Sequence, residues 1–265
     1  MTTTGKTRLM QAAFLLLLLG PDAAHSQTAD QEQVGRAAAA QILGAASLDE
    51  RAEVVRYVNL LGRSIAEYAN ADYKWRFGIV ATDSVNGFAT PGGIILLTRG
   101  LIDVLANEDE LAFVLAHEVA HVIRRHHYSV VQRQRLVERA AQTLQAASDS
   151  DVANLSQTSG VMYARGLDKG AEFEADRLGV EWVTRAGYDP AAALGVLEKI
   201  QRLGAADPRA ALMFSTHPSP NERLDQLLRA GIDRLPQPRT LSNVKVTRFA
   251  EFKRHAVGGR SAAQQ

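Results

Sequence analysis

The sequence predicts a mainly helical α+β domain with a small β-sheet ahead of its best-defined helix. Short apolar segments with strand-like composition lie between residues 75 and 98, and helical spacing of apolar residues dominates after Leu101. The composition is that of a globular chain with enough material for a core, since 46% of the 265 residues are hydrophobic and 22% are charged. No repeat of solenoid period is visible, so a single domain is the simplest organisation.

Charge and cysteine content exclude several classes of protein. The chain has 30 Lys and Arg against 29 Asp and Glu, so its overall charge gives no reason to expect a nucleic acid partner. It has no cysteine, which excludes disulfides, thiolate metal sites and cysteine nucleophiles. Any bound metal must therefore be held by His, Asp or Glu.

Residues 1–26 predict a secretory signal peptide. Lys6 and Arg8 precede the apolar run Leu9–Leu19, and residues 24–26 offer a cleavage point. The run has about eleven residues, whereas a membrane-spanning helix needs roughly 20. No second stretch approaches that length, so we expect an exported, soluble chain with no transmembrane segment after cleavage.

The segments before the sheet are expected to be helical in part. Residues 27–46 are rich in Ala and Gln and are predicted as a helix or an arm. Ser47–Glu50 has the pattern of a capping box, and apolar residues recur at helical spacing from Val54 to Tyr68. The main folded domain is expected to span residues 47–234.

Three short segments predict the sheet. Trp75–Val80 is predicted as a strand, Ser84–Thr90 as a turn or second strand, and Ile94–Thr98 as a third strand after the tight turn at residues 91–93.

Helices are expected almost throughout the remaining chain. Asn107–Glu110 resembles a second capping box, which would open a helix; residues 124–145 extend this helix or form another. A polar stretch at 148–160 predicts a mobile loop, and further helices are expected at 168–186, 191–203 and 220–230. Residues 235–265 form a C-terminal tail with no assigned structure.

The helix that begins near Asn107 carries a His-Glu-x-x-His motif. His117 and His121 share one helical face, so both imidazoles can reach one ion, and Glu118 lies beside that ion's open position. The alternative is a helix with two incidental histidines, which the strong apolar pattern around them disfavours. Catalytic zinc takes three protein ligands and one open position, so the motif predicts one zinc ion per chain and requires a third ligand.

Several side chains could complete such a site. Glu172 and Asp176 are four residues apart on a predicted helix, so one can bind metal while the other supports a ligand histidine. Glu174 points elsewhere and is expected to be solvated. On a straight helix His126 and His127 rotate away from the metal, and we expect them in a solvated basic patch with the neighbouring arginines.

The motif, followed some fifty residues later by Glu-Phe-Glu-Ala-Asp-Arg at 172–177, resembles metallopeptidase family forty-eight, a group of gluzincins. Residues 86–93, 98–101 and 215–223 resemble further segments of that family, and the resemblance covers roughly residues 47–230. It implies a zincin-like metalloprotease domain in which Glu172 is the third zinc ligand and Asp176 supports a ligand. Unlike the membrane-embedded members, the chain shows no transmembrane helices, and it is too short for an added repeat domain, so a stand-alone catalytic domain is expected.

The resemblance and the site together predict a zinc-dependent metalloendopeptidase of the cell envelope. It would hydrolyse peptide bonds of unfolded or misassembled envelope polypeptides through a zinc-bound water activated by Glu118. The expected location is the periplasm of a Gram-negative-type bacterium, peripheral to the outer membrane. An envelope chaperone or assembly factor with minor or regulated proteolysis is the alternative, and a zinc hydrolase of other bonds also fits the ligands.

Two further features have alternative interpretations. The resemblance suggests that His217 donates to the oxyanion or acts as an inhibitory fourth ligand, with Arg223 as a polar partner; alternatively, His217 ends a loop and Arg223 is solvated. A strand formed by Ile94, Ile95, Leu96 and Leu97 would bind substrate if it lies at the sheet edge, and is otherwise a plain core strand.

Overall fold

The computed structural model describes residues 25–146, 166–235 and 243–258. The predicted loop at 148–160 and nearly all of the predicted signal peptide lie outside these residues. In chain order the elements are β1 (His25–Ser26), α2 (Ala29–Ala45), α3 (Ala52–Glu67), β2 (Ala71–Asp72), β3 (Arg76–Val80), β4 (Gly87–Thr90), β5 (Ile94–Thr98), α4 (Arg99–Val104), α5 (Glu108–Ile123), α6 (His126–Ala146), α8 (Lys169–Arg185), α9 (Ala192–Leu203), α10 (Ala211–Thr216), α11 (Pro220–Arg229), the 3-10 helix Ile232–Arg234 and α12 (Asn243–Gly258).

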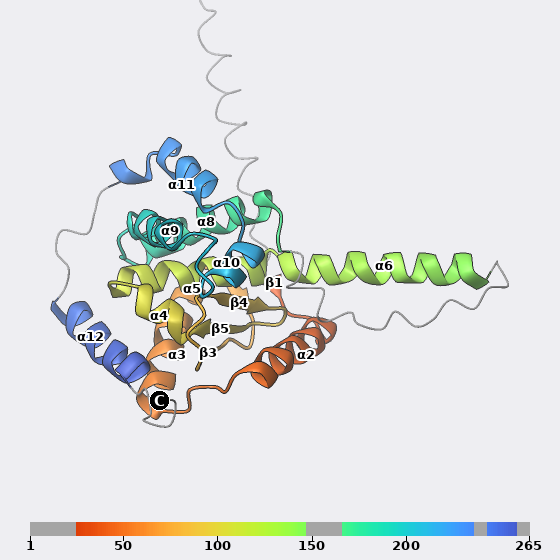
Figure 1. Ribbon diagram of the computed structural model, residues 1–265, viewed down its shortest axis with the longest axis horizontal. Coiled ribbons are helices and arrows are strands. Elements are labelled where there is room, and N and C mark those ends of the chain that lie inside the picture. Colours follow the sequence, from red (N-terminus) through yellow and green to blue (C-terminus); the bar gives the residue numbers. More distant parts are fainter. Residues whose placement is uncertain (1–24, 147–165, 236–242, 259–265) are drawn as a thin grey trace, which may run out of the picture.

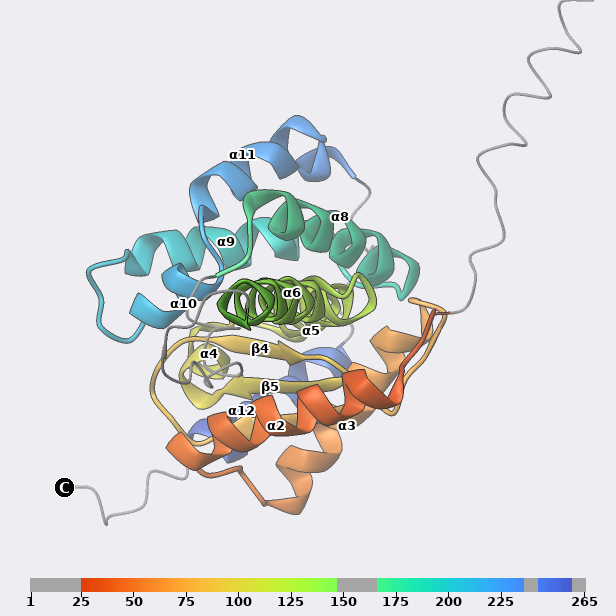
Figure 2. The same cartoon turned by 90° about the vertical axis from the view of Figure 1, so that its right-hand side faces the viewer.

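A three-stranded mixed sheet lies next to the helix that carries the motif, which confirms the predicted mainly helical α+β fold. Its order is β3-β5-β4, with β5 parallel to β3 and antiparallel to β4. Helix α5 lies on one face of the sheet and α2 crosses the other, while α8, α9 and α11 stack beyond α5 (Figures 1 and 2). Helix α5 is therefore the centre of the fold, with the sheet on one side and helices on the other.

The strands alternate between two apolar clusters, because successive side chains of a strand point to opposite faces. Ile95 and Leu97 belong to the main core with residues of α3 and α5. Leu96 packs with Phe88 and with Ala39 of α2 in a smaller cluster on the other face.

Helix α2 resolves the choice between an arm and a helix for residues 27–46. It begins at a capping box in which Thr28 and Gln31 bond each other's backbone N–H. It then crosses the turn between β4 and β5 so closely that a Cβ on Gly35 would lie 1.6 Å from the carbonyl oxygen of Pro91. Only glycine fits at this crossing.

The capping box predicted at Ser47–Glu50 is wrong. Leu48 forms an antiparallel bridge with Val80, so this segment extends the sheet, and α3 begins only after Arg51. The Asp49 carboxylate accepts bonds from the backbone N–H and the guanidinium of Arg51 and does not cap a helix at residue 47. At α5 the Asn107 side chain does accept from the Glu110 N–H, as predicted, but the Glu110 carboxylate turns to the N–H of Ala106.

The chain breaks between α5 and α6. Arg125 adopts a left-handed conformation with φ of 58°, and α6 starts at His126 as a separate helix that projects from the body (Figure 1). Of the two predictions for residues 124–145, a second helix is therefore the correct one.

The predicted C-terminal tail contains helix α12, which packs on the domain. Phe252 is buried and stacks on Tyr57 of α3, with ring centroids 4.3 Å apart. Arg248 pairs with Glu108 at the start of α5, and Lys245 lies 3.1 Å from Asp109. Lys199 of α9 pairs with Glu110, so each of these three acidic residues has a basic partner from another helix.

Among the described residues, no helix combines the length and the apolar content that crossing a bilayer requires.

Candidate metal centre

Both motif histidines lie in the middle of the fold. All residues of α5 are buried, and the Nε2 atoms of His117 and His121 lie 2.9 Å apart, as expected for one face of a helix. Burial and the charge of His117 lower the pKa of His121 well below its ordinary value, which keeps this imidazole neutral and able to bind metal.

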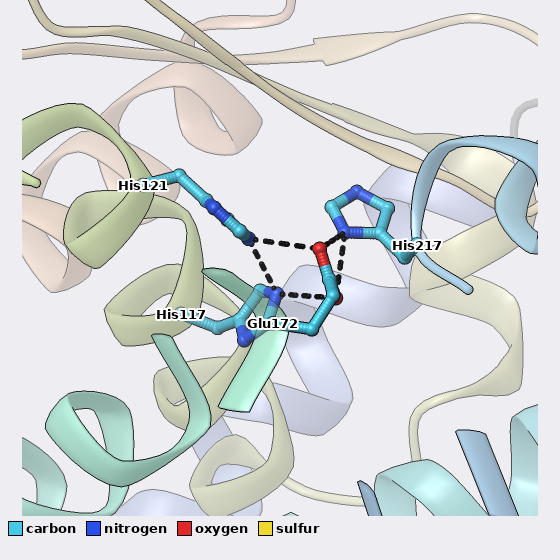
Figure 3. A group of neighbouring side chains, drawn as sticks. All are labelled: His117, His121, Glu172 and His217. Carbon is cyan, nitrogen blue, oxygen red and sulfur yellow. Dashed lines mark hydrogen bonds and ion pairs between the residues drawn. The ribbon is translucent and has the colours of Figure 1, made fainter. Parts of the chain in front are cut away.

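Glu172 joins the histidines from the first turn of α8. The N-terminus of this helix is capped by Asp168, and Glu172 is fully buried with its two oxygens 3.5 Å from Nε2 of His121 and 3.6 Å from Nε2 of His117. Burial alone would raise the pKa of Glu172, but the charges of His217 and Arg223 hold it well below the ordinary value. The carboxylate is therefore ionised and directed at both imidazoles (Figure 3).

His217 is the fourth member of this group. It follows α10, is buried, and places Nδ1 3.2 Å from a Glu172 oxygen. One ligand atom from each of His117, His121, Glu172 and His217 lies within 4.8 Å of the others. The adjacent Thr216 hydroxyl donates to the Asn86 side chain at 3.1 Å, which ties this loop to the start of β4. His217 therefore ends α10 with its ring inside the group and not in solvent.

The donor set fits zinc. Four N and O ligands at zinc distances in a tetrahedron would be about 3.3–3.6 Å from one another. Four of the separations in this group run from 2.9 to 3.6 Å, all of its ligand atoms lie within 4.8 Å of one another, and the group holds no sulfur donor. Nitrogen and oxygen donors in a buried tetrahedral group are typical of zinc sites.

Asp176 and Arg223 form a second layer around the group. Asp176 lies 2.9 Å from Nδ1 of His117, which leaves Nε2 of that ring directed at the centre. The Arg223 guanidinium donates to both oxygens of Asp176, at 2.8 and 2.6 Å, and lies 2.9 Å from Glu172. Arg223 is buried, so a solvated position for it is wrong, and its link to His217 runs through Glu172.

Glu118 lies next to the same group. It is buried, and its Oε1 lies 3.8 Å from Nε2 of His217. Its Oε2 has no hydrogen-bond partner among the described residues, and burial raises the pKa of this carboxyl. A Cβ on Gly87 would lie 2.5 Å from Glu118, so β4 passes close to it.

A small cavity of about 30 Å³ lies beside Glu118, with Leu101, Phe113, Val196 and Met213 among its apolar lining residues. That volume has room for only one or two water molecules.

The expected solvated patch at His126 and His127 is wrong. Because the chain turns at Arg125, His126 comes back toward the site, with Nδ1 2.8 Å from Nδ1 of His121 and Nε2 3.1 Å from Glu174. His127 is buried, and its ring centroid is 5.6 Å from that of His121. Glu174 is also not simply solvated, since it contacts His126 and, at 2.7 Å, Arg124.

The prediction of a substrate edge strand at Ile94–Leu97 is also wrong. These residues belong to β5, the central strand, where Ile95 pairs with Phe77 on one side and Ala89 on the other. Their backbone groups are used by both neighbours and three of the four side chains are buried, so the core-strand alternative is correct.

Comparisons with known proteins agree with this geometry. The model of "Peptidase family M48" matches residues 49–230. The "Beta-barrel assembly-enhancing protease" of Yersinia pestis is 31% identical over 245 residues, which cover 87% of this chain and 50% of that protein. The protein of the same name from Escherichia coli K12 is 30% identical over 221 residues, 78% of this chain and 45% of its own.

A more distant match is the "Mitochondrial metalloendopeptidase OMA1" of Schizosaccharomyces pombe. It is 31% identical over 172 residues, which cover 63% of this chain and 50% of that protein. The chain thus spans about half the length of these relatives.

Proposed function

The chain belongs to peptidase family M48, and on that premise we propose that it is a zinc-dependent metalloendopeptidase of the cell envelope. Its substrates would be unfolded or misassembled envelope proteins. The observation that carries the proposal is the buried His-His-Glu-His group with the unpartnered Glu118 oxygen beside it. The names of the relatives, which pair a protease with β-barrel assembly, support protein substrates, and the signal-like residues 1–26 support export.

Zinc would be held by His117, His121 and Glu172. Zinc in such a site supplies Lewis acidity, which polarises a carbonyl oxygen and makes water more acidic. Glu118 would take the proton from the attacking water and return it to the leaving amine, because it lies beside the group and its Oε2 has no competing partner among the described residues. Its raised pKa makes it a better base than an exposed carboxylate.

His217 would act as a fourth ligand in a closed, resting form of the enzyme. Its Nδ1 faces Glu172 within the group, an arrangement that supports a ligand better than a free donor. Opening would then require His217 to leave its place, which makes activity depend on a two-state equilibrium.

Incubation of zinc-loaded protein with unfolded casein tests the proposal. We expect fragments with zinc, none after a chelator removes it, and recovery when zinc is restored. Glu118→Gln serves as the matched control, since it keeps the side-chain volume and removes the base. Casein that stays intact with both the loaded wild type and loaded His217→Ala, under conditions where the proteins are folded, would contradict the proposal.

The name of the relatives also favours a role in assembly, the second candidate function. Glu118→Gln separates the two. An assembly factor would still bind unfolded clients and promote their assembly with this variant, whereas a pure protease would lose its effect on them.

A further inference from the structure

His121 has a second polar contact that the proposed zinc chemistry does not use. Its Nε2 faces His117 and Glu172, and its Nδ1 lies 2.8 Å from Nδ1 of His126. The other nitrogen of His126 lies 3.1 Å from Glu174. Three side chains therefore form one continuous line, from Glu174 through His126 to the motif histidine.

The chemistry of imidazole allows only one arrangement of hydrogens along this line once His121 binds metal through Nε2. A neutral ring that binds through Nε2 carries its proton on Nδ1, so His121 donates to Nδ1 of His126. His126 must then carry its own proton on Nε2, which donates to the Glu174 carboxylate. Each contact has one donor and one acceptor, so every nitrogen and oxygen along this line has a hydrogen-bond partner.

The surroundings hold this line in place. The Glu174 carboxylate is also bound by Arg124 at 2.7 Å, and the His126 side chain is only 10% exposed. His126 reaches His121 because the left-handed Arg125 interrupts the helix. On a continuous helix the two would be about 140° apart around the axis. A left-handed conformation is costly for arginine, which indicates that the surrounding contacts compensate for it.

Helix α8 thereby supports both motif histidines with different carboxylates. Asp176 contacts His117 directly at 2.9 Å, and Glu174 reaches His121 through His126. Glu172 itself faces the centre of the group. Each of the three acidic residues at positions 172, 174 and 176 thus contacts a different part of the site.

From this geometry we infer that His126 and Glu174 are positioning residues, which fix the tautomer and ring orientation of His121 and so strengthen zinc binding. The inference rests on the zinc site of the proposed function. Outer partners of this kind typically contribute 10–100-fold to metal affinity.

Zinc affinity of the purified chain, measured by competition with a chromogenic chelator, tests the inference. His126→Ala and Glu174→Ala should each weaken zinc binding by about 10–100-fold. Because the two residues act in series, the double variant should lose little beyond His126→Ala alone. Glu174→Gln keeps the side-chain volume and an acceptor for His126 but loses the charge, so it should restore only part of the loss, whereas a merely structural effect on packing predicts full recovery.

Two exposed residues give matched controls. Glu181→Ala removes an acid from the same helix, and His255→Ala removes a histidine far from the site; their side chains are 47% and 49% exposed. Both should keep wild-type affinity. If His126→Ala does not fold, Glu174→Ala and Glu174→Gln still decide the matter.

The outcomes separate the two claims. A folded wild type that binds no zinc would overturn the proposed function together with this inference. A wild type that binds zinc tightly, with folded variants at His126 and Glu174 within twofold of its affinity, would overturn the inference alone.

Discussion

Removal of the Arg223 guanidinium should destabilise the metal-free protein far more than the zinc-loaded one. Arg223 is 5% exposed and its charge is matched by two buried carboxylates, those of Asp176 and Glu172. Arg223→Met keeps most of the apolar stem but leaves both carboxylates without their cation.

The magnitude follows from burial. Removing one partner of a buried ion pair costs about 3–5 kcal/mol, because a charge remains in a low-dielectric environment. For a domain of this size each kcal/mol corresponds to about 2–4 °C in Tm, so the metal-free variant should melt about 6–20 °C below the wild type. Bound zinc is a divalent cation next to Glu172, so the decrease in Tm should be smaller in the zinc-loaded variant.

Calorimetric melting of both proteins, each with chelator and with saturating zinc, checks this expectation. Arg229→Met is the matched control, because it lies on the same helix and is exposed. It should melt within about 2 °C of the wild type, as surface substitutions rarely change stability by more than 0.5 kcal/mol. The reasoning fails if metal-free Arg223→Met has the same Tm as this control. It also fails if zinc leaves the difference in Tm between Arg223→Met and the wild type unchanged.

Three further predictions concern the base, the fourth ligand and the C-terminal helix. Glu118→Gln should lower casein cleavage by about 10²–10⁴-fold while metal analysis finds zinc in place; an unchanged rate would show that Glu118 is not the base. His217→Ala should raise cleavage of an unstructured peptide if His217 closes the site, and should lower it about a hundredfold or more if His217 donates to the oxyanion. Activity within twofold of wild type would remove His217 from both roles. Phe252→Ala should cost about 3–5 kcal/mol in unfolding free energy, because the ring is buried against Tyr57, and a urea titration with an unshifted midpoint would contradict that packing.

The centre of the site could be predicted from the sequence because its geometry is local. Two histidines four residues apart share a helical face in any helix, and the same holds for Glu172 and Asp176. The resemblance to the family, now confirmed, then implied that these two pairs, which lie some fifty residues apart in the chain, form one site.

What could not be predicted depends on a single backbone angle or on strand order. The position of His126 follows from the left-handed Arg125, which no sequence pattern marks because arginine rarely adopts this conformation. Likewise, an apolar run such as Ile94–Leu97 predicts a buried strand without indicating whether it lies at the centre or the edge of its sheet. Helix α12 buries only a narrow apolar stripe within a polar segment, so its packing was missed.

The acidic start of α5 has a consequence for how access to the site can be controlled. Glu108, Asp109 and Glu110 are buried and paired with three different basic residues, while the motif lies about 10–20 Å further along the same helix. The negative charges also suit the positive end of the helix dipole. The two motif histidines thus lie on a helix whose N-terminal end is held by ion pairs with α9 and α12. In the proposed resting form, opening of the centre would therefore be taken up by the loop around His217 and not by α5.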